Sequence, residues 1–156
     1  MSGDMLHHAL EYVARGWPVF PLHTPRDSGC SCGDRDCSSV GKHPRTPKGL
    51  HDASTDEQQV KAWWSRWPNA NIGGRTGVAF DVLDIDHADL EEGTADWPAV
   101  QMPGGPIATT GNGWHFYVAP GASGNRTAFT QHCDWRGGGG YVVMPPSLHY
   151  SGRRYE

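Results

Sequence analysis

One apolar segment that ends in two carboxylates constrains the fold of this chain more than any other feature. Val78-Ala79-Phe80-Asp81-Val82-Leu83-Asp84-Ile85-Asp86 has the composition of a β-strand. Because side chains alternate along a strand, Asp84 and Asp86 point to the same face, about 6.6 Å apart at Cα. Two like charges there repel each other and are costly to desolvate, which favours a divalent cation between them. An isolated Asp-x-Asp is more often the solvated end of a strand, so this interpretation depends on the rest of the chain.

Length and charge limit the classes of protein to consider. A chain of 156 residues suits one domain spanning 1–156, with room for a small additional lobe. Proteins that bind duplex DNA nonspecifically usually carry a net positive charge, whereas this chain has a net charge of -4. Any contact with nucleic acid must therefore come from a local basic patch. The sequence contains no apolar run of membrane-spanning length and no signal-peptide core, and we therefore expect a cytoplasmic protein.

The segment of residues 23–48 has few large apolar side chains, so burial alone cannot order it. Three cysteines and one histidine within it have the spacing of zinc ligands. They are Cys30, Cys32, Cys37 and His43. His23 or His51 could replace His43 as the fourth ligand. We expect a structural Zn²⁺ in this zinc-binding loop, because four protein ligands leave no position for a substrate.

The densest run of basic residues lies in the same loop, at residues 41–48. Its cations are Lys42, Arg45 and Lys48. A short charge run is usually a solvated loop. Its position beside the zinc ligands nevertheless makes it a candidate for contact with DNA phosphates.

Periodicity predicts two amphipathic helices. Apolar residues recur at helical spacing between Asp4, a candidate N-cap, and Gly16, a candidate C-cap. Ser54 or Thr55 is predicted to cap a second helix, which ends before Pro68. Its tryptophans are expected in the core rather than as a platform for bases, because they share one helix face. They are Trp63, Trp64 and Trp67.

The remaining apolar runs are short and predict strands separated by glycine-rich loops. Besides 78–86, strands are expected at 17–22, 107–110, 114–118, 133–136 and 141–144. The prolines of 17–22 favour a sheet edge. We further expect a glycine-rich turn at 71–77, a brief helical turn at 88–92 and a mobile loop at 120–132 that carries Arg126.

Gly111-Asn112-Gly113 is a strong hairpin signal between two of these strands. It sets His115 near the start of the second strand, on the face opposite Phe116. A single histidine on a strand is commonly structural. The adjoining glycine turn, whose N–H groups could meet an anion, also indicates a functional role, so both interpretations stay open.

Three elements follow one another in a specific order. They are Asp84-Ile85-Asp86, then Thr110-Gly111-Asn112-Gly113-Trp114-His115, then Asp134-Trp135-Arg136 with the glycines to Gly140 and Tyr141-Val142-Val143-Met144-Pro145-Pro146-Ser147. Together they resemble the primase-polymerase domain of the archaeo-eukaryotic primase superfamily, in the bifunctional form of phage and plasmid replication proteins. The resemblance implies an α+β fold with an RRM-like catalytic sheet and a smaller N-terminal α/β lobe that carries the zinc-binding loop. It also implies that the chain is the N-terminal part of a longer replication protein.

The resemblance implies roles for individual residues. The family's metal-binding acids correspond to Asp84, Asp86 and Asp134, and its nucleotide-binding histidine corresponds to His115. The other residues expected at the nucleotide are Arg136, Thr110, Gly111, Gly138 and Gly139. Met144 departs from the family pattern, in which a small residue is usual at this place.

Nucleotide joining suits these residue types on chemical grounds as well. The reaction needs a deprotonated 3′-hydroxyl, a triphosphate held in line and neutralised charge on the leaving pyrophosphate. Two Mg²⁺ or Mn²⁺ ions about 3.5 to 4 Å apart meet these needs, and aspartate oxygens are suitable ligands. We expect a DNA primase and DNA-directed DNA polymerase that uses nucleoside triphosphates on a single-stranded DNA template, with a helicase in the same chain or in trans.

Two other functions stay open. A noncatalytic module stabilised by zinc could bind single-stranded DNA for origin recognition. A metal-dependent nuclease could use the same acids to activate water. For each of the three functions, we expect the cytoplasm of a bacterium or of a phage-infected cell and no membrane partner.

Overall fold

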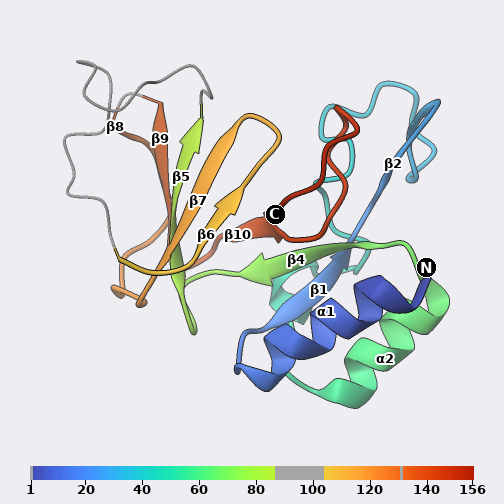
Figure 1. Cartoon of the computed structure of the whole chain (residues 1–156), viewed down its shortest axis with the longest axis horizontal. Helices are drawn as coiled ribbons and strands as arrows, with labels where there is room; N and C mark the ends of the chain where they lie inside the picture. The colour runs from blue at the N-terminus through green and yellow to red at the C-terminus, as the bar shows by residue number, and fades with distance from the viewer. Residues whose placement is uncertain (1, 87–103, 131) are drawn as a thin grey trace.

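The computed structural model describes residues 2–86, 104–130 and 132–156, which form a mixed α+β structure (Figure 1). The N-terminal elements are α1 (Ser2–Ala14), β1 (Val19–Leu22), β2 (Pro25–Arg26), β3 (Gly29–Cys30), the 3₁₀ helix η1 (Gly49–Asp52), α2 (Glu57–Arg66) and β4 (Asn71–Arg75). They are followed by β5 (Asp81–Asp86), β6 (Ile107–Thr109), β7 (Gly113–Val118), β8 (Arg126–Thr130), β9 (Cys133–Arg136) and β10 (Tyr141–Met144). The helical turn expected at 88–92 lies outside the described residues. Neither helix of the described residues is long and apolar enough to span a membrane.

The first lobe is a three-stranded antiparallel sheet, ordered β1-β4-β10, with α1 and α2 beside it (Figure 1). Apolar side chains from both helices bury themselves against this sheet, and Ala9, Val60 and Trp64 are almost completely inaccessible to solvent. The proline-containing strand β1 lies at the sheet edge, as the sequence predicts.

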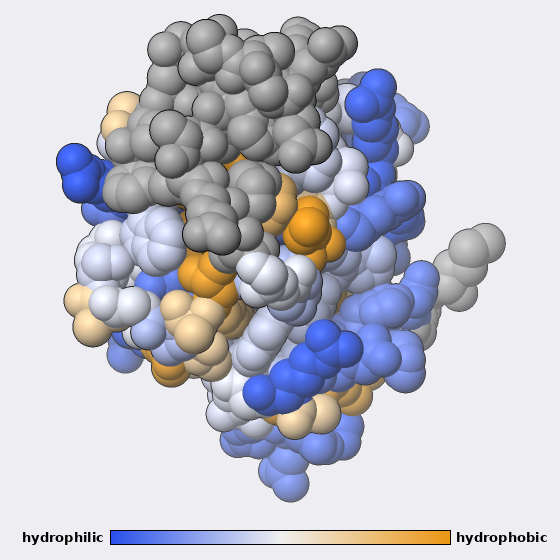
Figure 2. Space-filling model, turned by 60° about the vertical axis from the view of Figure 1, so that its left-hand side comes forward, coloured by the Kyte–Doolittle hydropathy of each residue, from blue (hydrophilic) through white to orange (hydrophobic). Residues whose placement is uncertain are grey.

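The second lobe is a five-stranded antiparallel sheet, ordered β6-β7-β5-β9-β8, with β5 at its centre. Figure 2 brings this side of the molecule forward and shows apolar and polar residues mixed on its surface. The expected α+β class is confirmed. The RRM-like arrangement of this sheet stays a prediction.

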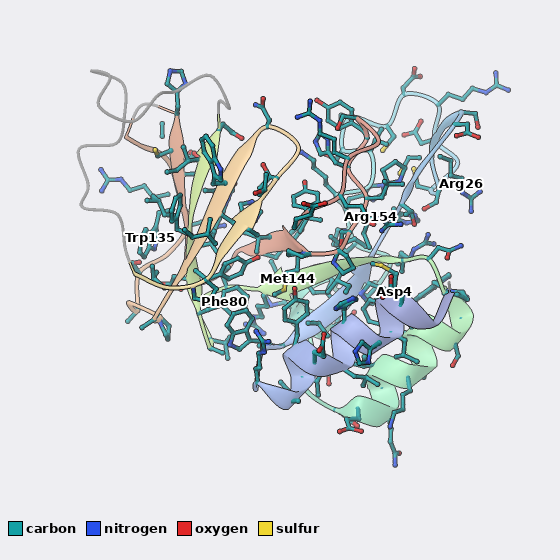
Figure 3. All side chains as sticks on the ribbon, viewed as in Figure 1. Asp4, Arg26, Phe80, Trp135, Met144 and Arg154 are labelled. Carbon is teal, nitrogen blue, oxygen red and sulfur yellow. The ribbon has the colours of Figure 1, made fainter. Side chains whose placement is uncertain are left out.

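The two sheets share one core because the chain returns to the first lobe at its end. Strand β10 pairs with β4, although it follows β9 of the second sheet in sequence. Phe80 and Met144, labelled in Figure 3, are buried in the same apolar cluster as Val82 and Tyr117. Strand β5 is therefore held in place by apolar contacts with the first lobe as well as by pairing within its own sheet.

Both predicted N-caps are wrong. The first helix already begins at Ser2, so Asp4 lies within its first turn, where its carboxylate pairs with His8. At the second helix Asp56 is the cap, since its side chain accepts a hydrogen bond from the Gln58 N–H at 2.9 Å. Ser54 is displaced from this role because its backbone pairs with Val19 of β1.

The expected glycine-rich turn at 71–77 is instead largely a central strand, β4. A Cβ atom on Gly73 would lie 2.8 Å from the ring of Phe20, and one on Gly74 would overlap the Met144 side chain. The glycines are therefore needed for close packing on both faces of the strand rather than for a turn. Met144 is fully buried against this strand.

Two further boundaries differ from the prediction. The acidic strand begins at Asp81 rather than Val78, because the buried carboxylate of Asp81 accepts hydrogen bonds from the Gly77 and Gly121 N–H groups and so closes a turn. The supposed mobile loop 120–132 contains edge strand β8, whose register against β9 shifts between Arg126 and Thr130. This irregular pairing removes the side-chain alternation by which a strand is recognised in a sequence.

Candidate active site and zinc site

The pairing of β5 with both of its neighbours brings the predicted site residues together. Asp84 lies opposite His115 of β7 on one side and opposite Asp134 of β9 on the other. Directly opposed residues of antiparallel strands point to the same face, so these three side chains and Asp86 share one face of the sheet. On the opposite face, Leu83, Ile85 and Phe116 form a separate apolar cluster.

Arg136 lies close to the carboxylates of both Asp84 and Asp134, and His115 lies close to that of Asp84. The Arg136 Nη2 atom lies 2.8 Å from Asp134 Oδ2 and 3.5 Å from Asp84 Oδ2. The His115 Nε2 atom lies 3.4 Å from Asp84 Oδ1. Burial raises the pKa of Asp84, but the hydrogen bond and charge of His115 and then the charge of Arg136 outweigh burial, so this pKa lies below its ordinary value.

Asp86 differs from Asp84 in its electrostatic surroundings. Burial raises the pKa of Asp86, and the negative charges of Asp84 and Asp134 raise it further. No described cationic side chain lies within ion-pair distance of Asp86, although Lys42 and His115 lower its pKa slightly from farther away. Asp86 is therefore the acid of this site without a cation in direct contact among the described residues.

A cavity of about 350 Å³ adjoins these side chains. Of the predicted residues, Asp84, Asp86, His115, Arg136 and Gly139 line it, as does Lys42. The other lining residues are Leu50, Asn125, Gly140, Tyr141, Val142, Val143 and Tyr155.

Four predicted residues do not line this cavity, namely Asp134, Thr110, Gly111 and Gly138. Asp134 nevertheless contacts the cavity-lining Arg136, and its Oδ1 accepts a hydrogen bond from the Ala128 N–H at 2.7 Å. Gly111 packs against the ring of His149, and the Gly138 N–H donates to the Ser123 carbonyl.

Sequence reasoning missed Asn125, Tyr141 and Tyr155 at this cavity. Asn125 Oδ1 accepts a hydrogen bond from the Gly137 N–H at 3.1 Å, and the Tyr141 hydroxyl donates to the Lys42 carbonyl at 2.9 Å. Tyr155 is buried, and burial followed by the charges of Asp84 and Asp86 raises its pKa. Only the Gly124-Asn125 turn signal could have indicated one of them from sequence.

Within the described residues, four side chains of the 23–48 loop are grouped closely enough to hold a metal ion. The ligand atoms of Cys30, Cys32, Cys37 and His43 all lie within 4.8 Å of one another. His43 Nε2 is 3.4 Å from the Cys30 sulfur and 3.5 Å from the Cys37 sulfur. Zinc bonds of about 2.3 Å to sulfur and about 2.0 Å to nitrogen, at a tetrahedral angle, give a separation of about 3.5 Å. These side chains could therefore bind zinc.

Of the three candidate histidines, His43 is the one that belongs to this group. The His23 ring stacks on His43 with centroids 4.4 Å apart, and its Nδ1 is hydrogen-bonded to the Ser31 hydroxyl. Burial, with the charge of Arg45, lowers the pKa of His23 to about 4. His51 lies in η1, outside the group.

The three cations of residues 41–48 lie in different surroundings. Lys42 lines the cavity beside the acids. Arg45 lines a different cavity, and Lys48 lines neither of these two. The structure thus separates cations that the sequence groups into one DNA-contacting segment.

The model of one protein family matches nearly all of this chain. The family is described as "Bifunctional DNA primase/polymerase, N-terminal", and the match covers residues 9–156. The chain belongs to this family. Membership in the primase/polymerase family supports a DNA primase or polymerase type of function in general, and confirms the resemblance of the motifs. Comparison with curated proteins and with solved structures gave no match.

The pKa shifts of the acids predict opposite effects of two amide substitutions on stability. Folding raises the pKa of Asp86, so the folded state favours the protonated carboxyl group. This group therefore adds to the free energy of unfolding below the ordinary pKa of 3.8, and the gain is lost as the pH rises through the raised pKa. Asp86→Asn should therefore raise the denaturation midpoint at pH 7 without added divalent metal, and the gain should shrink as the pH falls toward 3.8.

Asp84→Asn provides the matched comparison. The lowered pKa of Asp84 means that the ionised form stabilises the fold above 3.8, so the amide should lower the midpoint at pH 7. An Asp86→Asn protein less stable than the wild type at pH 7 would show that the electrostatic description is wrong.

The geometry of the loop also predicts which histidine is required for zinc. Protein purified without chelator should contain about one zinc ion per chain by mass spectrometry of the metal content. His43→Ala should lose most of this zinc, whereas His23→Ala and His51→Ala should keep it. Retention of zinc by His43→Ala together with its loss from His23→Ala would assign the fourth ligand differently.

Proposed function

We propose that this chain catalyses template-directed nucleotidyl transfer, making primers and extending DNA on a single-stranded template from nucleoside triphosphates. The observation that carries the proposal is the juxtaposition of Asp84, Asp134 and His115 on three neighbouring strands, with Asp86 beside them. The match to a primase/polymerase family supports the same reaction class.

The residues present are suited to two divalent ions. The donors of Asp84, Asp86 and Asp134 are all carboxylate oxygens, which Mg²⁺ and Mn²⁺ prefer. Burial, followed by the charges of Asp84 and Asp134, raises the pKa of Asp86, and a bound metal ion would stabilise its ionised form. When bound, such ions would acidify the primer 3′-hydroxyl and offset the charge of the pyrophosphate.

His115 and Arg136 are proposed to contact the phosphates of the nucleotide. Arg136 is paired with Asp84 and Asp134, and binding of metal ions by these acids would release its guanidinium for phosphate oxygens. His115 lines the cavity, and its buried Nδ1 atom has no hydrogen-bond partner among the described residues. A buried polar atom of this kind favours a ligand as its partner.

Lys42 is proposed as a third phosphate contact, in place of the DNA contact that its sequence neighbours suggest. It lines the same cavity as the acids, and its backbone is fixed on both sides. Asn71 Nδ2 donates to the Gly41 carbonyl at 2.9 Å, and the Tyr141 hydroxyl donates to the Lys42 carbonyl. Because Lys42 directly precedes His43, a structural zinc ion in the loop would add to these hydrogen bonds in ordering the segment that carries Lys42.

The nucleotide-joining function is preferred to both alternatives for specific reasons. A purely DNA-binding module would not need three acids gathered on one sheet at an electrostatic cost. A nuclease does not bind a nucleoside triphosphate, so it would not need His115 and Lys42 as contacts for the phosphates. We further propose a helicase as a partner, and the cytoplasm of a bacterium or of a phage-infected cell as the location.

Removal of the acids tests this function. Asp84→Asn, Asp86→Asn and Asp134→Asn should each lower nucleotide incorporation by about a thousandfold or more, because electrostatic stabilisation of the transition state is lost. The assay uses a single-stranded template, nucleoside triphosphates and Mn²⁺. Asp27→Asn, an exposed acid of the zinc-binding loop, is the control and should keep full activity. Incorporation that persists in Asp84→Asn and Asp86→Asn would exclude the assignment.

The role of Lys42 predicts a selective kinetic effect. Lys42→Ala should raise the KM for the nucleoside triphosphate by about tenfold, while the affinity for template stays within about twofold of the wild type. Lys48→Ala is the matched control, since Lys48 does not line the cavity. If Lys42→Ala instead binds template more weakly and keeps the wild-type KM for nucleotide, Lys42 contacts DNA rather than the nucleotide.

A further inference from the structure

A second and larger cavity lies outside the candidate active site, with a volume of about 490 Å³. It is lined by β2, by the segment after α2 and by the chain after β10. Four arginines line it, one each from β2, the 41–48 segment, the end of α2 and the chain after β10, and Figure 3 labels two of them together with Asp4. They are Arg26, Arg45, Arg66 and Arg154. We call this space the arginine cavity.

The arginine cavity has a large excess of positive charge. None of its four arginines forms an ion pair within the described part of the chain. Its single acidic lining residue is Asp4, an exposed side chain that pairs with His8 at 3.1 Å. Four guanidinium groups without an acidic partner, on a chain of net charge -4, form the kind of local basic patch that contact with nucleic acid requires.

Two of the guanidinium groups are held in place by an aromatic ring. Arg45 lies 5.5 Å and Arg66 4.7 Å from the centroid of a ring of Trp67. Arg45 is also fixed by hydrogen bonds to the Leu22 carbonyl at 3.0 Å and the Ser31 hydroxyl at 2.7 Å. Each guanidinium has five N–H donors, so donors remain for a ligand.

We propose that the arginine cavity binds phosphate groups of the single-stranded DNA template, a proposal that rests on the function given above. Guanidinium groups match phosphate oxygens with paired N–H donors. Arg26, Arg66 and Arg154 are exposed and come from three segments, an arrangement that suits successive phosphates of a strand.

The arginine cavity is separate from the cavity that contains the acids. The two share no lining residue. Substitutions in the arginine cavity should therefore change the affinity for template while leaving the binding of nucleotide intact.

The test measures the affinity for a fluorescent single-stranded oligonucleotide as a function of salt. The double variant Arg66→Gln, Arg154→Gln should bind about tenfold more weakly at low salt, and its slope of log K against log salt should fall by about 1.4, about 0.7 for each phosphate contact. The control Arg15→Gln, Arg153→Gln removes the same charge outside the cavity and should bind like the wild type. Asp4→Asn, which removes a negative charge from the rim, should bind more tightly.

Equal losses in the two double variants would overturn the proposal, as would unchanged affinity and slope in the cavity variant. Loss of nucleoside triphosphate binding with full oligonucleotide binding would also overturn it, because the cavity would then be a nucleotide site. If the cavity variant does not fold, an Asp4→Asn protein with wild-type affinity decides against the proposal. A wild-type protein that binds the oligonucleotide through these arginines but incorporates no nucleotide would refute the proposed function alone.

Discussion

The register of β5 between β7 and β9 is the constraint on which the rest of the candidate active site depends. It sets Asp84 opposite His115 and Asp134 at once, and a shift of one residue would turn each side chain of β5 to the other face. The register is fixed by burial, because Val82 and Ile85 are fully inaccessible on opposite faces. Apolar packing on both faces of the strand thus specifies where Asp84 and Asp86 lie.

The same arrangement has an electrostatic cost that the fold only partly offsets. His115 and Arg136 lower the pKa of Asp84 and Arg136 also pairs with Asp134, whereas the pKa of Asp86 is raised. Groups in such conflict are typical of sites that bind a charged ligand, because stability is given up for function. The loop of residues 23–48 would follow the same logic with a metal ion bound, since it has few large apolar side chains and its cysteines and His43 could bind zinc.

Local patterns predicted the parts of the site that lie on one strand or one hairpin. Alternation placed Asp84 and Asp86 on a common face, and the Gly-Asn-Gly turn placed His115. The approach of Lys42 and Tyr155 depends on tertiary packing of distant segments, which no short window of sequence encodes. The strand β4 was misread for a similar reason: its glycines make room for Phe20 and Met144, which are 53 and 70 residues away from Gly73 and Gly74 in the chain.

The central claim is that folding gathers acids from β5 and β9 into one site for divalent ions. Crystals soaked in Mn²⁺ and a nonhydrolysable nucleoside triphosphate, with diffraction data collected at the manganese absorption edge, test it most directly. The account predicts anomalous density for Mn²⁺ bound by Asp84, Asp86 and Asp134, with the triphosphate next to His115, Arg136 and Lys42. Manganese bound elsewhere, with these three carboxylates still paired only to protein side chains, would contradict it.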